Sequence, residues 1–231
     1  MPGRPLTIEQ AEALSSVLLK NYEAGGAKFR ATIPYSPTAT FVLTGEVNYE
    51  RHLAGARLTV ETSSTPTVRP TELFWNDTDV VEELDGLTLE MATRGRTAVK
   101  FLSRPMTTTS PQDIVLKLLL GTASQQRDNP QLVQQGSARF LRSDTIGTDA
   151  VDVYRFGERT VYWVRKTDGL LARVEAKITS IEGTTVVDFL EHVRVDLTGP
   201  RRTEVVASTE LPEEVLARLT SGLLDAVVKA P

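Results

Sequence analysis

Residues 161–174, VYWVRKTDGLLARV, carry the clearest structural signal in this chain of 231 residues. Residues 160–165 are rich in β-branched and aromatic side chains, which favour strands, and residues 170–178 form a second segment of strand character. Thr167-Asp168-Gly169 lies between them, and an Asp-Gly pair suits the backbone of a tight hairpin turn. The stretch therefore predicts two antiparallel strands joined by a short turn.

Similar segments lie on both sides of this hairpin. In the first half of the chain, apolar residues occupy every second position, which gives each strand one apolar and one polar face. The segments with strand character are 28–33, 41–49, 56–60, 87–91 and 99–101 in the first half, and 138–142, 151–156 and 184–195 in the second. Strands of this kind, joined by turns such as Asp85-Gly86 and Arg94-Gly95, are typical of an antiparallel meander.

Four other segments have helical character. Residues 7–22 begin with Thr7, which caps a helix, and Gln10 three positions later completes a capping box. Ser110 is a second N-cap, and the run after it is apolar on nearly every side, so we expect that helix to be buried. The remaining helices are a short one at 130–135 and a last one that begins at Pro212.

This order of helix, strands, helices, strands and helix predicts the α+β class, because the strands are segregated from the helices instead of alternating with them. We expect a single domain over residues 1–231, built on one curved antiparallel sheet with a helix at each terminus. The helical segment at about 110–136 is then an insertion between two halves of that sheet. No linker divides the chain.

The composition excludes several classes of chemistry. The chain has no cysteine, so disulfides, thiolate catalysis and cysteine-bound zinc are absent. Its two histidines, His52 and His192, lie apart in the sequence, and we expect surface positions for both, with His192 on the polar face of its strand. No phosphate-binding glycine motif occurs. The predicted protein is not an enzyme, and it has no cofactor and no metal.

Charge argues against nucleic acid as a partner. The formal net charge is −4, whereas nucleic-acid binders usually present a basic patch. Glu82, Glu83 and Asp85 form an acidic cluster that would matter chemically only if its pKa values were split by the environment. No apolar stretch approaches the roughly 20 residues that cross a bilayer, so no transmembrane segment is expected.

Three segments resemble a known family: 129–133 (NPQLV), 161–174, and 183–189 (GTTVVDF). Together they are similar to the carrier superfamily that includes the outer-membrane lipoprotein carrier and the actinobacterial lipoproteins of the LppX/LprG type. The resemblance implies a half-open β-barrel with helices on its concave side and a cavity that takes lipid or acyl groups. A composition rich in Arg, Val and Thr fits an actinobacterial source.

The compartment follows from the same resemblance. The chain lacks the lipidated cysteine of exported lipoproteins, and no apolar signal core follows Met1 to Pro5. We therefore expect the cell envelope, outside the cytoplasm, if a signal or anchor was removed, and the cytoplasm if the sequence is taken as written. We also expect a monomer.

The function predicted from these observations is non-enzymatic binding of a lipid, an acylated molecule or a lipoprotein in an apolar cavity. The alternative is a protein-interaction or envelope-sensor domain whose core is filled, with a protein as partner. The volume of the cavity distinguishes these two functions: an open cavity favours ligand binding, and a filled core favours the interaction domain. The side chains expected to line the cavity are Phe41, Leu43, Trp75, Leu89, Phe101, Leu116, Leu119, Leu120, Tyr162 and Phe189.

Overall fold

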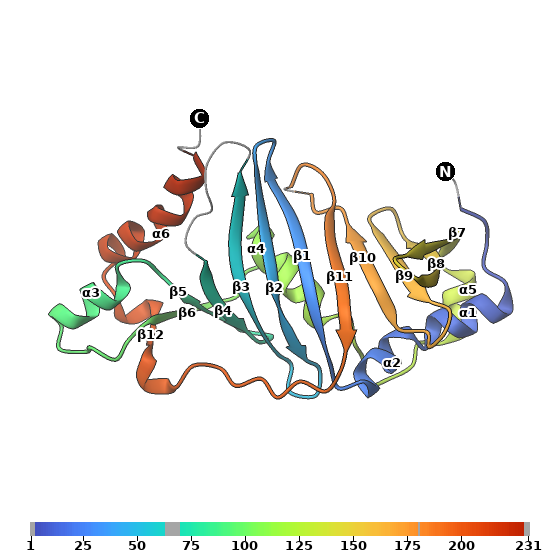
Figure 1. Cartoon of the computed structure of the whole chain (residues 1–231), viewed down its shortest axis with the longest axis horizontal. Helices are drawn as coiled ribbons and strands as arrows, with labels where there is room; N and C mark the ends of the chain where they lie inside the picture. Colours follow the sequence, from blue (N-terminus) through green and yellow to red (C-terminus); the bar gives the residue numbers. More distant parts are fainter. Residues whose placement is uncertain (1–2, 63–69, 180, 229–231) are drawn as a thin grey trace.

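The computed structural model describes residues 3–62, 70–179 and 181–228, and the side chains of these residues up to 220 (Figure 1). Its main feature is one sheet of twelve strands in the order β12-β6-β5-β4-β3-β2-β1-β11-β10-β9-β8-β7. The strands are β1 Gly26–Ser36, β2 Ala39–Asn48, β3 Leu53–Thr62, β4 Thr71–Trp75, β5 Asp79–Glu83, β6 Phe101–Pro105, β7 Arg139–Ile146, β8 Asp149–Phe156, β9 Thr160–Arg165, β10 Leu171–Ala176, β11 Thr185–His192 and β12 Val205–Ala207.

The sheet consists of two antiparallel meanders placed side by side. Strands β1 to β6 follow one another in one direction from the centre, and β11 back to β7 follow one another in the other. The two meanders are joined by the antiparallel pairing of β1 with β11, in which Ala31 lies opposite Val187. Within the described part of the chain, only β12, which pairs with β6, is parallel to its neighbour. The sheet is open, because β12 and β7 at its two ends do not pair with each other.

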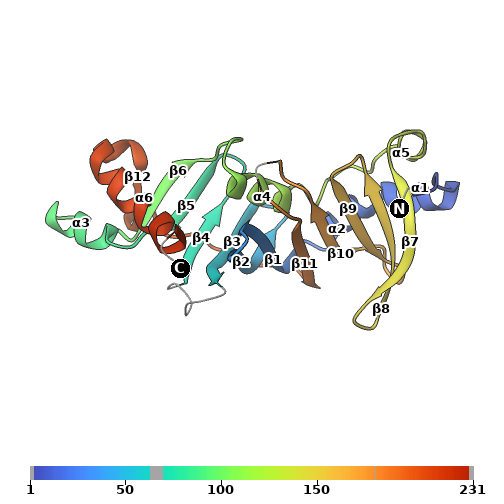
Figure 2. The same ribbon diagram turned by 90° about the horizontal axis from the view of Figure 1, so that it is seen from above.

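This topology explains the position of the central helix α4 (Pro111–Leu120). The chain must pass from β6, near one end of the sheet, to β7 at the other end, and α4 lies on that path, across one face of the sheet (Figure 2). We call this face the α4 face. Phe29, Leu43 and Trp75 point towards it and share the main core with Leu116 and Leu119, all of them buried. The expectation of a buried helix is confirmed for this side of α4.

The helices at the two ends of the chain cover different parts of the sheet (Figure 1). The capping box of Thr7 and Gln10 is present. The helix expected over 7–22 is divided at Ser16, whose backbone ends one helix and begins the next. Besides α4 the helices are α1 Ile8–Ser15, α2 Val17–Glu23, α3 Leu87–Thr93, α5 Pro130–Gln135 and α6 Glu213–Val228. Within the described residues, no helix is both long and apolar enough to cross a membrane.

The strand predicted over residues 87–91 is wrong, because this segment is helix α3. Leu87 and Met91 are four residues apart, which places both on one side of a helix, and both are buried in a second core cluster with residues of α6. Leu89, which alternation placed beside them, is 74% exposed. The segment is rich in residues that favour helices. Packing against α6 buries Leu87 and Met91, and only a helix places these two residues on the same side without Leu89.

The predicted surface position of His192 is also wrong. The sheet has a bulge where β1 pairs with β11, since Lys28 lies opposite Glu191 but Phe29 lies opposite Phe189. A bulge adds one residue to a strand and so shifts the alternation that follows it. The half-buried His192 ring stacks on Phe189 at 5.5 Å between centroids, and its Nε2 is 2.7 Å from the Leu171 carbonyl oxygen. His192 therefore packs against Phe189 and β10 instead of facing solvent.

Candidate functional site

A pocket of about 570 Å³ lies between the N-terminal end of α4 and the α4 face of the sheet. It is bounded by five neighbouring strands, β1 to β5, together with β6 and the start of α4, and Thr220 of α6 reaches it from the far side. The residues that line it are Ile33, Tyr35, Phe41, Leu58, Thr71, Leu73, Glu82, Leu84, Arg104, Ser110, Pro111, Gln112, Ile181 and Thr220.

One wall of this pocket is apolar. Ile33, Phe41, Leu58 and Leu73 come from four adjacent strands, and each occupies an alternate position that faces α4. Tyr35 lies against Phe41, with ring centroids 4.7 Å apart, and is 40% exposed. The apolar wall therefore runs from the interior outward to an aromatic residue that meets solvent.

The other end of the pocket is charged. Arg104 of β6 lies between two carboxylates and donates from Nε to Glu82 Oε1 at 3.0 Å. Its two terminal nitrogens bind Asp113 of α4 in a bidentate pair, at 2.8 and 2.9 Å. The backbone N–H of Thr107 also donates to Asp113, at 2.8 Å. We call Glu82, Arg104 and Asp113 the charged cluster.

The two carboxylates of the charged cluster differ in electrostatic environment. Burial, the largest effect, raises the pKa of Glu82 above its usual range, and Arg104 offsets this only in part. Burial also acts on Asp113, but hydrogen bonds from Arg104 and Thr107 outweigh it and lower the pKa of that carboxyl. The pKa of Arg104 is raised, because its two carboxylate partners outweigh the effect of its burial. Asp113 and Arg104 therefore stay ionised, and Glu82 is the member of the cluster that titrates most readily.

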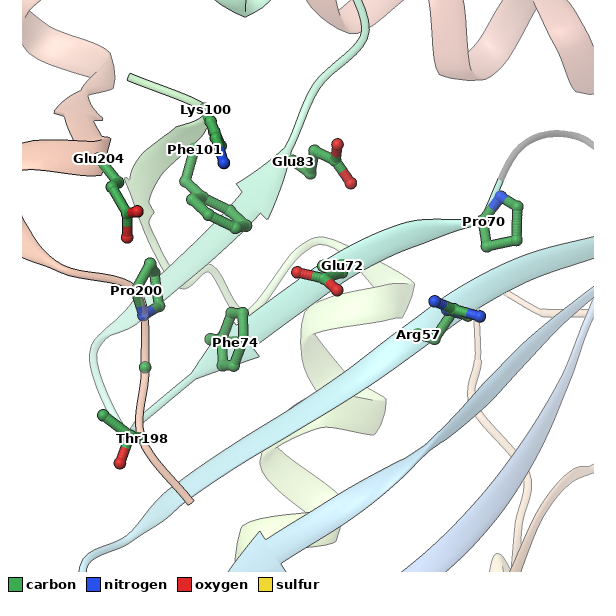
Figure 3. A pocket seen from close by; sticks show the side chains of 11 residues that line it. Arg57, Pro70, Glu72, Phe74, Glu83, Lys100, Phe101, Thr198, Pro200 and Glu204 are labelled. Atoms are coloured by element: carbon green, nitrogen blue, oxygen red, sulfur yellow. The ribbon is translucent and has the colours of Figure 1, made fainter. Parts of the chain in front are cut away.

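A second pocket, of about 620 Å³, lies on the opposite face of the same strands. Figure 3 shows that Arg57, Glu72 and Phe74 line it from β3 and β4, while Lys100 and Phe101 face it from the start of β6. Phe74 and Phe101 make an edge-to-face pair at 5.9 Å. Charged and polar side chains dominate the rest of this lining, so it suits a wide solvated groove better than an apolar ligand.

The ten side chains predicted to line a cavity are distributed over several environments. Of these, Phe41 lines the pocket beside α4, and Phe101 lines the pocket on the opposite face. Leu89 lies exposed on α3, beside a shallow pocket that α3 forms with α6. Tyr162 is partly buried against the main core. The other six are packed within that core: Leu43, Trp75, Leu116, Leu119, Leu120 and Phe189.

Sequence reasoning missed the charged cluster, although a signal for part of it was present. Val80, Glu82 and Leu84 alternate, so a strand that buries the two apolar residues must turn Glu82 to the same face. The same argument places Arg104 beside Leu102 on that face. In the sequence, Glu82 was instead grouped with Glu83 and Asp85 as an acidic cluster.

Comparisons with known proteins give no family. No protein family and no curated protein matches the chain. Among solved structures, the chain is similar to an uncharacterised conserved protein from Thermus thermophilus, with 11% identity over 81% of this chain and 94% of that one, and a TM-score of 0.41. Similarity at this level is too low to assign a shared fold or activity.

Proposed function

We propose that this protein is a non-enzymatic binding protein that holds the apolar part of a lipid or an acylated molecule in the pocket beside α4. The observation that carries the proposal is the apolar wall of Ile33, Phe41, Leu58 and Leu73, which faces a space of about 570 Å³. Ligand pockets of small molecules typically measure roughly 300–1,000 Å³ and are mostly apolar, with a few polar groups at defined positions.

The energetics of such a pocket favour an alkyl chain. Each methylene group removed from water contributes about 0.8 kcal/mol. A chain of about ten methylenes would therefore gain roughly 8 kcal/mol before the costs of association, which are of similar size. The chain alone is therefore expected to bind with millimolar affinity or more weakly, because a net gain of about 4 kcal/mol corresponds to a Kd of about 1 mM.

The resemblance to the lipoprotein-carrier superfamily supports the same proposal. In this view the open sheet acts as a half-open β-barrel whose concave side is the α4 face, and α4 covers part of the cavity. The open ends of the sheet and the position of α4 between β6 and β7 are compatible with it. A place in the cell envelope is part of the same proposal.

A direct test is native mass spectrometry of the purified protein, followed by solvent extraction and lipid analysis. We expect an adduct of lipid mass that is lost on extraction. The variant Leu58→Trp places a large ring in the pocket and should lose the adduct, because the added volume occupies the space of the ligand. The matched control is Leu190→Trp, at an exposed position on β11 that lines none of the pockets described above.

Two outcomes would count against the proposal. A bare mass from several hosts, together with no uptake of lipid probes, would contradict it. Equal adducts in the Leu58→Trp variant and the wild type would place the ligand elsewhere.

The alternative, a protein-interaction domain with a filled core, is favoured by one observation. Six of the predicted lining residues, three of them on α4 itself, are packed in the main core, so the cavity does not extend along the whole helix. If the wild type binds no lipid, the exposed Leu89 on α3 becomes the first position to test for a protein partner.

A further inference from the structure

The polar end of the pocket beside α4 has a specific charge arrangement. Among the side chains that the structure describes, only Glu82 and Arg104 are charged members of its lining. Asp113 lies directly behind Arg104 and is completely buried. With Glu82 ionised, the three members of the charged cluster sum to one negative charge, although a guanidinium is present.

Arg104 has little capacity left for a ligand. Its Nε–H is used by Glu82, and its two terminal nitrogens are used by Asp113. A further N–H of Nη1 points to the Pro105 carbonyl oxygen at 3.4 Å. A guanidinium that already holds a bidentate carboxylate gains little from a second anion, because its charge is neutralised and most of its donors are occupied.

Glu82 has the opposite character. Its residue is 9% exposed, and it lines the pocket. Oε1 accepts from Arg104, whereas in the described part of the chain Oε2 accepts no hydrogen bond. Oε2 is not fully buried, so a donor supplied by a ligand in the pocket can reach it and form a charge-assisted hydrogen bond. The pocket therefore combines an apolar wall with one unfilled acceptor.

From this geometry we propose that the pocket selects amphiphiles whose head group donates hydrogen bonds to Glu82, as a hydroxyl or an ammonium does, and rejects those with an anionic head. The inference rests on the proposed function, because it names the class of ligand for the same pocket. The alkyl chain lies against Ile33, Leu58 and Leu73, and the head group lies between Glu82 and the first turn of α4. An anionic head at this position would meet a like charge in a partly desolvated site.

The test uses three probes with the same chain, dodecylamine, dodecanol and dodecanoate, each titrated at neutral pH by displacement of a neutral fluorescent probe from the full chain. We expect the amine and the alcohol to bind at least about tenfold tighter than the carboxylate, since like-charge juxtaposition across an interface costs several kcal/mol. The variant Glu82→Gln keeps an oxygen that can accept from Arg104 and removes the charge, so it should bring the three affinities to within about threefold of one another.

The matched control is Glu83→Gln, which removes the same charge at the next position of β5, where the side chain lines the groove on the opposite face. It should keep the wild-type order of affinities. Thermal unfolding of both variants checks that each is folded.

The outcomes separate the inference from the proposed function. Equal affinities of the three probes in the wild type, tightest binding of dodecanoate, or an unchanged order in Glu82→Gln would overturn the inference and leave a lipid-binding pocket standing. No displacement by any of the three probes, with no lipid in the purified protein, would overturn both.

Discussion

The two ends of α4 meet the sheet in different ways. From the middle of α4 to the residues just after its C-terminal end, neutral hydrogen bonds join this segment to the core: the Trp75 indole N–H donates to the Leu116 carbonyl at 3.0 Å, and Nδ2 of Asn21, on α2, donates to the Thr122 carbonyl at 2.7 Å. The Tyr49 hydroxyl meets the Thr122 hydroxyl at 3.2 Å. At the N-terminal end, the helix meets the charged cluster and an open pocket.

This difference separates stability from binding. Neutral buried hydrogen bonds that are fully paired contribute about 1 kcal/mol each and fix side chains in one arrangement. A buried ion pair contributes little net stability compared with an apolar replacement, since desolvation offsets the attraction. The C-terminal end therefore anchors α4, whereas under the proposed function the charged cluster at the other end serves the ligand of the pocket.

The largest effect is expected at the anchored end. Leu119→Asp places a carboxylate at a fully buried position in the main core, which is made of apolar side chains. We expect a loss of more than about 4 kcal/mol, which is a large part of the total stability of a domain. Urea unfolding measures it. The control Gln112→Asp, at the pocket on the same helix, should change stability by less than about 1 kcal/mol, and equal losses at the two positions would refute the contrast.

The second effect is expected in the charged cluster. Asp113→Ala leaves Arg104 with one carboxylate partner and leaves the Thr107 N–H without an acceptor, so stability should fall by about 3 kcal/mol. The exposed pair of Arg142 with Asp144 provides the comparison, because Asp144→Ala should cost less than about 1 kcal/mol. Urea titration of both variants measures the two losses in the free energy of unfolding. A loss below about 1 kcal/mol for Asp113→Ala would mean that the cluster is not held as described.

A smaller effect tests whether the anchored end takes part in binding. Trp75→Phe removes the donor to the Leu116 carbonyl and leaves a small gap, for which we expect a loss of about 1–3 kcal/mol. The affinity for dodecylamine should stay within about twofold of the wild type, since Trp75 does not line the pocket. A tenfold loss of affinity with little loss of stability would show that the two ends are coupled.

The smallest effect is a pH dependence. Because burial raises the pKa of Glu82, the folded state keeps a proton at pH values just above 4.5 that the unfolded chain has already lost. Stability of the wild type relative to Glu82→Gln should therefore fall as pH rises above 4.5 and become constant once Glu82 is ionised in the folded state as well. Urea unfolding of both proteins across this range measures the difference. A difference that grows with pH would mean that Arg104 dominates over burial.

Local features of the fold were predictable from the sequence. The caps at Thr7 and Ser110 and the turn at Gly169 depend on residues a few positions apart, and the structure contains all three. Alternation also identified the apolar face of β1 to β3. Alternation gave the wrong structure for α3. Its apolar residues are two positions apart, as in a strand, but Leu87 and Met91 are four apart, which also fits one side of a helix.

The candidate site was predictable only in part, because its contacts are distant in sequence. Nothing local to β1 indicates that it pairs with β11, and this pairing makes one sheet of the two meanders. Asp113 lies in the first turn of α4, where an acidic residue is common, and nothing local in the sequence indicates that it binds Arg104 of β6. The size of the pocket depends on how far α4 covers the sheet, which side-chain packing decides.

The most direct test of the central claim is a crystal structure of the full chain with dodecylamine brominated at the end of its alkyl chain. We expect an anomalous bromine peak in the pocket beside α4, in contact with the wall formed by Ile33, Leu58 and Leu73, and we expect the amine to lie nearest Glu82. A bromine peak in the opposite groove beside Phe74 and Phe101, or a pocket filled by a rearranged α4, would contradict it.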